Sequence, residues 1–243
     1  MEVQRILKEF NELIEKNRKE EAEQFLNHKI EEARKHGEWK AEIKFLNELM
    51  QFYSNAEKKD LGLKVMEEVL SLAKQHEMTD SLFYGMILLN AATAMSAFGD
   101  ANGAMELYED AYAIYEEKLH PNDFRFAGLY NKMGVACEET GQFERAEECF
   151  NKALMIMERL PRGEMELAVT HTNLASMYHQ AGKEEKVEFH LQKTKKYFDS
   201  KRVIRDGYYA HTCVTCIPIL EKLGYIEMAE ELKERARRVY EGA

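Results

Sequence analysis

A repeat with a period near 42 residues constrains this sequence more than any other feature. Gly99, Gly141, Gly182 and Gly224 follow one another at intervals of 42, 41 and 42 residues. A small or short apolar residue stands five positions after each glycine, and in the best copies a larger apolar residue follows four positions later. A fixed period of this length predicts stacked copies of one supersecondary unit, each packing mainly on its neighbours.

The residues of the repeat predict two antiparallel helices joined by a tight turn. The glycine ends the first helix, because a left-handed C-cap suits a residue that has no Cβ atom. Small residues such as Ala104, Ala146 and Ala229 allow two helix axes to approach closely. Larger residues such as Tyr108 and Phe150 then fill the groove of the neighbouring helix.

Proline placement agrees with a chain that is helical almost throughout. Pro121 and Pro161 lie between repeats, whereas Pro218 falls inside a helical pattern and is expected to kink that helix. We therefore predict an all-α fold of twelve helices in six hairpins, in a single solenoid domain over 1–243. Its expected parts are an N-terminal capping hairpin over 1–37, repeats over 38–80, 81–123, 124–165 and 166–206, and a C-terminal repeat or cap over 207–243.

The best copy begins with His-Pro-Asn-Asp at 120–123 and continues through Asn-Lys-Met-Gly at 131–134, Gly-Gln-Phe-Glu-Arg-Ala at 141–146 and Phe-Asn-Lys-Ala-Leu at 150–154. This pattern resembles the tetratricopeptide repeat family, in the longer form found in kinesin light chains. The resemblance is strongest over 81–199 and implies a right-handed superhelical solenoid. Three positions depart from the family pattern: Cys137 replaces a tyrosine, Val187 an alanine, and Glu57 the turn glycine.

The charge and hydropathy of the sequence limit the classes of binding partner and the cellular location that we expect. Lys and Arg number 34 against 44 Asp and Glu, so the net charge of −10 argues against nonspecific binding to nucleic acid or to an anionic membrane. No apolar signal core begins the sequence, and no segment approaches the roughly 18 apolar residues of a membrane span. We therefore expect a cytoplasmic protein, and the charge-rich pattern suits a bacterial adaptor.

The residues that could carry chemistry favour packing over catalysis. Cys213 and Cys216 form a CxxC pattern, but it lies in a helical segment without the βαβ context of a redox motif. His171 and His179, eight residues apart, lie on roughly one helix face and could form a metal site or a pH-sensitive contact, although no carboxylate completes a ligand set. We expect no enzymatic activity, no metal and no cofactor.

A row of asparagines is the strongest candidate site. Asn47, Asn90, Asn131 and Asn173 stand on successive first helices at intervals of 43, 41 and 42 residues, although asparagine is a mediocre helix former. Its amide can both donate to and accept from a peptide group, and the resemblance implies that the first helices line a concave groove. Alternatively, the amides bond to the backbone or to one another between repeats. The predicted site adds Thr93, Glu138, Ser176, His179 and His211.

These observations leave three hypotheses for function. The preferred one is a non-catalytic scaffold that binds a protein or an extended peptide in the concave groove. The second is a structural protein that self-associates, for example as a homodimer, through apolar residues of its end helices: Phe10, Leu13, Ile14, Val239 and Tyr240. The third is a ligand- or peptide-sensing regulator that acts through a partner, because residues 1–37 offer no recognition helix for DNA.

Overall fold

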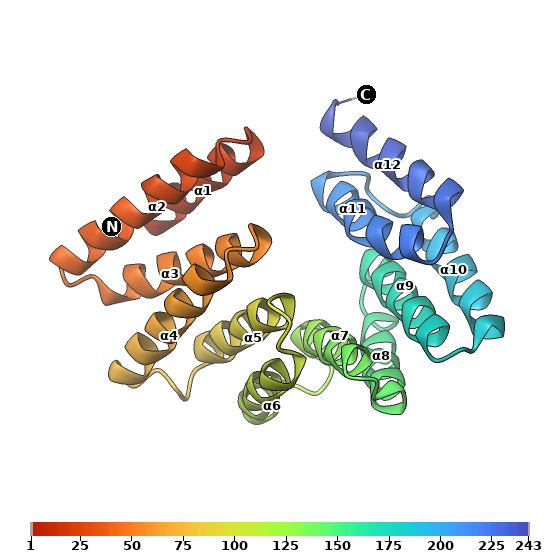
Figure 1. The fold of residues 1–243 in the computed structure, drawn as a ribbon, viewed down its shortest axis with the longest axis horizontal. Helices are drawn as coiled ribbons and strands as arrows, with labels where there is room; N and C mark the ends of the chain where they lie inside the picture. The colour runs from red at the N-terminus through yellow and green to blue at the C-terminus, as the bar shows by residue number, and fades with distance from the viewer. Residues whose placement is uncertain (1, 243) are drawn as a thin grey trace. The chain divides into compact units, whose positions relative to one another are not determined.

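The computed structural model describes residues 2–242, which form twelve α-helices and no strand (Figure 1). The predicted all-α fold of six hairpins is therefore confirmed. In chain order the helices are α1 (Val3–Glu15), α2 (Lys19–Lys35), α3 (Trp39–Asn55), α4 (Lys59–Gln75), α5 (Leu82–Ala97), α6 (Ala101–Lys118), α7 (Phe124–Glu139), α8 (Phe143–Met157), α9 (Glu164–Gln180), α10 (Glu184–Phe198), α11 (Gly207–Lys222) and α12 (Ile226–Tyr240). No helix within 2–242 has the length and apolar character needed to cross a membrane.

The chain divides into two compact units, Met1–Leu119 and His120–Ala243, called here the N-terminal and the C-terminal unit. Each contains three hairpins, α1 to α6 in the first unit and α7 to α12 in the second. The single solenoid over 1–243 stays a prediction, and its end residues 1 and 243 lie outside the described part. Before the fifth hairpin, Arg162 turns the chain at φ 67° and α9 begins at Glu164.

The turns inside the hairpins explain the repeating glycines. Gly99, Gly141, Gly182 and Gly224 all have positive φ, between 69° and 88°, as the left-handed C-cap requires. Glu57 stands at the equivalent turn between α3 and α4 and also has positive φ, 56°. The turn thus keeps its shape where the sequence has lost the glycine, at the cost of placing a side chain in a conformation that favours glycine.

Small residues set the distance between the two helices of a hairpin. Ala104 and Ala146 are fully buried at the positions that the repeat reserves for small side chains. In the hairpin of α7 and α8, a Cβ atom added to Gly134 would lie 2.6 Å from the ring of Phe150. Phe150 is itself fully buried, so the glycine is what lets this large ring sit against the backbone of α7.

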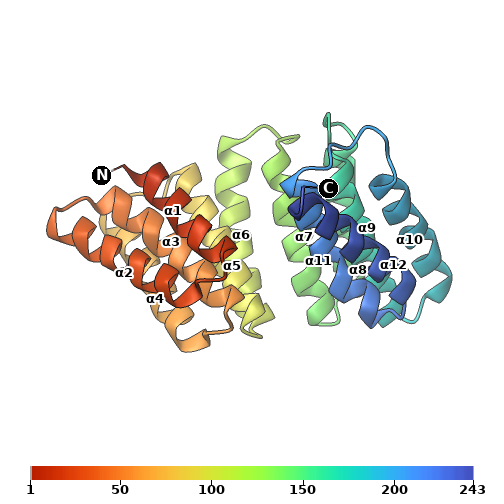
Figure 2. The same ribbon diagram turned by 90° about the horizontal axis from the view of Figure 1, so that it is seen from above.

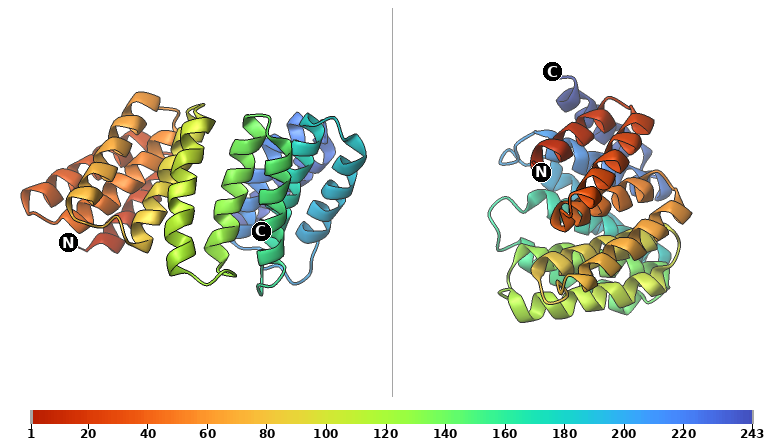
Figure 3. Two further views of the ribbon diagram at one scale, coloured as in Figure 1. Left: turned by 90° about the horizontal axis from the view of Figure 1, so that it is seen from below. Right: turned by 90° about the vertical axis from the view of Figure 1, so that its left-hand side faces the viewer.

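Within each unit, successive hairpins pack through their first helices (Figures 2 and 3). In the N-terminal unit α3 contacts both α1 and α5, and in the C-terminal unit α9 contacts both α7 and α11. The second helices α2, α4 and α8 each pack on the first helix of the next hairpin in their unit. First helices therefore lie side by side in each unit, which places their polar residues on neighbouring elements.

The apolar residues expected to be available for self-association differ in exposure. Phe10 is 2% exposed and its ring packs edge-on against Phe52, with 5.8 Å between centroids. Leu13, Ile14 and Val239 are half-buried, and Tyr240 is 64% exposed. Phe10 therefore belongs to the core of the N-terminal unit, since α3 already covers it.

Candidate functional site

Polar residues of α7, α9 and α11 form one surface of the C-terminal unit. Along each helix they recur every three or four residues, so they share one side of that helix. Contacts from Glu138 on α7 to α9, and its electrostatic interaction with Lys222 on α11, bring the three helices' residues together. We call this surface the first-helix face; it consists of Asn131, Val135, Glu138, Val169, Asn173, Ser176, Gln180, His211, Thr215, Pro218 and Lys222.

Glu138 joins α7 to α9. Its Oε1 accepts a hydrogen bond from the Ser176 hydroxyl at 2.6 Å and another from the side-chain amide of Gln180. Burial raises the pKa of the Glu138 carboxyl, whereas the Ser176 hydroxyl, the positive charge of Lys222 and the Gln180 amide oppose that rise. The structure thus brings together two predicted site residues, Glu138 and Ser176, as a hydrogen-bonded pair.

Asn131 also bonds to α9 but leaves one polar atom without a partner. Its Nδ2 donates to the Thr170 hydroxyl at 2.8 Å, and that hydroxyl donates its single proton to the Glu166 carbonyl oxygen. This order fixes the orientation of the amide, because the threonine oxygen has only acceptor capacity left. The Asn131 Oδ1 atom is buried and accepts no hydrogen bond within the described residues.

The part of the face on α11 is exposed and carries a second acceptor that lacks its usual donor. Pro218 lies inside α11 and has no N–H group, so the carbonyl of Val214 loses its helical partner. Val214 is 47% exposed, and His211, Thr215 and Lys222 are exposed beside it. A segment bound on this face can therefore reach these exposed side chains and the half-buried Val135 and Val169 of the neighbouring helices.

Two other predicted residues of this unit, Asn173 and His179, lie differently. Asn173 is buried on α9, on the same side of the helix as Val169 and Ser176. His179 is exposed at the end of α9, where its Nδ1 lies 2.6 Å from a carboxylate oxygen of Glu184 across the turn to α10. His179 thus belongs to the hairpin turn.

In the N-terminal unit, two asparagines bond to each other. The Asn90 Nδ2 donates to the Asn47 Oδ1 at 3.1 Å, which links α5 to α3. Asn47 is 3% exposed and Asn90 is half-buried. Thr93 donates to the Leu89 carbonyl of its own helix. This asparagine pair follows the alternative in which the amides bond to one another between repeats.

His171 and His179 do not come together, because eight residues turn a helix by about 80° beyond two full turns. His171 instead lies against His190 of α10, with 2.8 Å between their Nδ1 atoms. Both rings are buried, and burial lowers the pKa of each to about 4. At neutral pH the pair is uncharged, with one Nδ1 donating and the other accepting.

The sequence reasoning missed His190, Thr170 and Gln180. His190 could have been found, since it falls in the apolar stripe of α10 with Val187, Leu191 and Thr194, all of which are buried. Thr170 and Gln180 carry no such signal, because a threonine or a glutamine on a helix is equally common on a solvated surface. Their roles depend on which side chain of α7 lies opposite them.

The cysteines are packing residues. Cys137, Cys149, Cys213 and Cys216 are all buried thiols that form no disulfide. Burial raises the pKa of Cys213 to about 11 and that of Cys216 to about 12, so both stay as unreactive thiols at neutral pH. Within 2–242 no group of three or more His, Cys, Asp or Glu side chains could hold a metal ion.

Comparison with known proteins identifies the repeat. Residues 125–198, the hairpins α7–α8 and α9–α10, match the family model of the tetratricopeptide repeat. The hairpins α7–α8 and α9–α10 carry tetratricopeptide repeats. No curated protein matches the sequence. The predicted resemblance is confirmed, and the tetratricopeptide match covers the two hairpins that hold Asn131, Glu138 and Ser176.

Solved structures extend the tetratricopeptide-like fold beyond the matched residues. BtubC (BKLC) from P. vanneervenii is 19% identical with a TM-score of 0.61, covering 92% of this chain and 91% of that protein. The nearly identical TPR-like repeats of a putative kinesin light chain from Podosopora anserina are 18% identical with a TM-score of 0.58, covering 82% and 94%. PilW, a widely conserved type IV pilus biogenesis factor, is 15% identical with a TM-score of 0.62, covering 99% and 94%. These similarities show a shared fold of helical repeats.

Proposed function

We propose that this protein is a non-catalytic scaffold that binds an extended segment of a partner protein on the first-helix face of its C-terminal unit. The observation that carries the proposal is the polar surface of α11 beside α9. There an exposed Thr215 and His211 flank a Val214 carbonyl that has lost its helical donor. An extended peptide presents backbone N–H donors at regular intervals, and the acceptors of the face can bond to these donors.

The chemistry of the face indicates the kind of segment it takes. Glu138 and Lys222 are its only formally charged residues, and each lies within the electrostatic reach of the other. The half-buried Val135 and Val169 add an apolar contribution to the neutral polar residues. We therefore expect an internal segment of polar to mildly apolar character, since one lysine is a weak clamp for a C-terminal carboxylate.

A pair of matched substitutions tests whether this face binds. Val169→Arg places a large charged side chain on the first-helix face, and Met155→Arg makes the same kind of change on α8, where Met155 is 56% exposed. We expect affinity capture from the native cell extract to recover a partner with the wild type and with Met155→Arg, and to lose it with Val169→Arg.

Thermal unfolding of both variants provides the control, because Val169 is half-buried and its substitution could loosen α9. Loss of the partner counts for the proposal only if Val169→Arg unfolds within ~5 °C of the wild type. Recovery of the same partner with all three proteins would place the binding surface elsewhere and contradict the proposal.

A further inference from the structure

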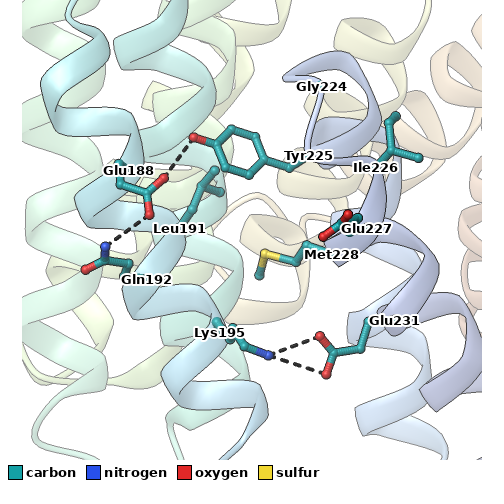
Figure 4. A pocket seen from close by; sticks show the side chains of 10 residues that line it. All are labelled: Glu188, Leu191, Gln192, Lys195, Gly224, Tyr225, Ile226, Glu227, Met228 and Glu231. Atoms are coloured by element: carbon teal, nitrogen blue, oxygen red, sulfur yellow. Dashed lines mark hydrogen bonds and ion pairs between the residues drawn. The ribbon is translucent and has the colours of Figure 1, made fainter.

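A cavity of about 510 Å³ lies between α10 and α12, the second helices of the last two hairpins (Figure 4). Both helices belong to the C-terminal unit, and no backbone contact joins them, because the last hairpin packs on α9 through α11. The cavity therefore lies on elements other than those of the first-helix face. Its volume is in the range of sites that hold small molecules or a few side chains of a partner.

Side-chain bridges bound the cavity at its two ends. At one end the Tyr225 hydroxyl donates to Glu188 at 3.0 Å, and Gln192 donates to the other carboxylate oxygen of Glu188 at 3.0 Å. At the other end Lys195 donates to Glu231 at 3.0 Å. Figure 4 shows these two bridges above and below an open middle.

The middle of the cavity is apolar. Leu191 of α10 is buried at its floor, and Met228 of α12 is half-buried opposite it. Ile226, at the start of α12, lines the same cavity and is 53% exposed. An apolar side chain that entered between the two bridges would remove Ile226 and Met228 from water, which is favourable by about 25 cal/mol for each Å² buried.

The rim carries an excess of negative charge. Glu188, Glu227 and Glu231 line the cavity with Lys195. Glu231 is paired with both Lys195 and Arg235, whereas no cation within the described residues pairs with Glu188 or Glu227. Among the described residues Glu188 accepts hydrogen bonds only from the neutral donors Tyr225 and Gln192, so its charge is not neutralised by those bonds. Glu227 is exposed at the first turn of α12. The rim therefore attracts cations and repels phosphates and carboxylates.

We propose that the cavity between α10 and α12 is a second protein-binding site, which takes a peptide segment with an apolar side chain between basic residues. The apolar side chain fills the space between Leu191 and Met228, and the lysine or arginine residues on either side of it lie against Glu188 and Glu227. The site goes beyond the function proposed above, because it uses different helices and takes a basic segment, whereas the first-helix face takes a polar to mildly apolar one. The scaffold then holds two segments on separate surfaces.

Fluorescence anisotropy with three labelled hexapeptides tests the proposal. The first has two leucines between two pairs of lysines, the second replaces the leucines with serines, and the third replaces the lysines with glutamates. We expect saturable binding of the first peptide alone, and weaker binding as the salt concentration rises. The proposal is overturned if the first peptide shows no saturation up to about 1 mM, the weak end of measurable affinity, or if the serine peptide binds equally well.

Matched charge reversals locate the site. Glu188→Lys/Glu227→Lys changes the rim, and Glu185→Lys/Glu230→Lys makes the same change in charge on the same two helices, at exposed residues that do not line the cavity. We expect the rim variant to weaken binding at least about tenfold, which corresponds to 1.4 kcal/mol, and the control variant far less. Equal weakening by both variants would show only a general attraction of lysine to an acidic protein, and would overturn the proposal.

Two further variants keep the outcome clear. Glu227→Lys alone leaves both bridges in place and should still weaken binding, so that a loss seen with the double rim variant is not a loss of the fold. Val169→Arg should bind the first peptide as the wild type does. Loss of binding in Val169→Arg would assign the peptide to the first-helix face, contradict the second site and leave the function proposed above intact.

Discussion

The imidazoles of His171 and His190 make the stability of the C-terminal unit sensitive to pH. Burial, together with the positive charge of Lys193, lowers the pKa of both to about 4, and Lys186 and Glu147 act on the pKa of His190 in opposite directions. An unfolded histidine titrates near pH 6.5. Between pH 6.5 and pH 4 the unfolded chain therefore binds more protons than the native one, so the free energy of unfolding falls as the pH falls.

We expect this pair to cost the native state on the order of 2 kcal/mol for each histidine when the pH drops from 7 to 5. Urea unfolding at both pH values measures the loss. The variant His171→Gln/His190→Gln keeps polar side chains that can bond to each other but removes the titration. If it loses as much stability as the wild type between pH 7 and 5, the histidines are not responsible.

At the scale of single residues, the sequence predicts the helix on which a residue lies better than it predicts the side chain that the residue contacts. The period places Asn47, Asn90 and Asn131 on first helices. Asn47 and Asn90 bond to each other, as in one of the two expected alternatives, whereas Asn131 bonds to the Thr170 hydroxyl, which neither alternative included. The period does not reveal that Thr170 lies opposite Asn131, nor that His190 lies opposite His171. Such pairs depend on the rotation and the crossing angle of two helices, which packing sets and which a one-dimensional spacing does not contain.

At the scale of the hairpin, the backbone of Glu57 in the turn after α3 is strained, and a glycine at this position would relieve the strain. Glu57 has φ 56°, in the region that costs a residue with a Cβ atom roughly 1 kcal/mol relative to glycine. Its side chain is exposed, so no contact of the core is lost with it. We expect Glu57→Gly to raise the free energy of unfolding by about 0.5–1 kcal/mol, as measured by urea denaturation.

The same substitution inside the next helix is the matched control. Glu67 is exposed in the middle of α4, where glycine should lower the free energy of unfolding by about 0.5–1 kcal/mol. Opposite signs at the two sites would assign the effect to the backbone conformation of residue 57. Destabilisation at both would contradict the account of the turn.

The helices and hairpins were easier to predict from the sequence than the contacts between side chains, for a physical reason. Turn glycines at a fixed interval and small residues at the crossing points are local requirements of each hairpin, so they are written into every copy. The turn before α9, where Arg162 has φ 67°, lies between two hairpins and outside the series of repeating glycines, so the period gives no sign of it. The cavity between α10 and α12 was likewise not predictable, since it results from the way α11 packs on α9.

At the scale of the whole molecule, the two proposed binding surfaces differ in their chemical character. The first-helix face is neutral and rich in hydrogen-bonding groups, whereas the cavity between α10 and α12 is apolar with an acidic rim. Both lie in the C-terminal unit, where α7 to α10 match the tetratricopeptide repeat. Repeat folds suit this division, because each helix layer contributes its own surface while the hairpins share one core.

Site-specific photo-crosslinking tests the central claim, that the first-helix face holds a segment of a partner protein. A benzophenone amino acid at Val169 samples the face, and one at Met155 on α8 samples a surface outside it. After irradiation in the native extract, we predict a discrete adduct from position 169, mapping to one internal segment of one protein, and none from position 155. An adduct from position 155 with none from position 169 would contradict the claim.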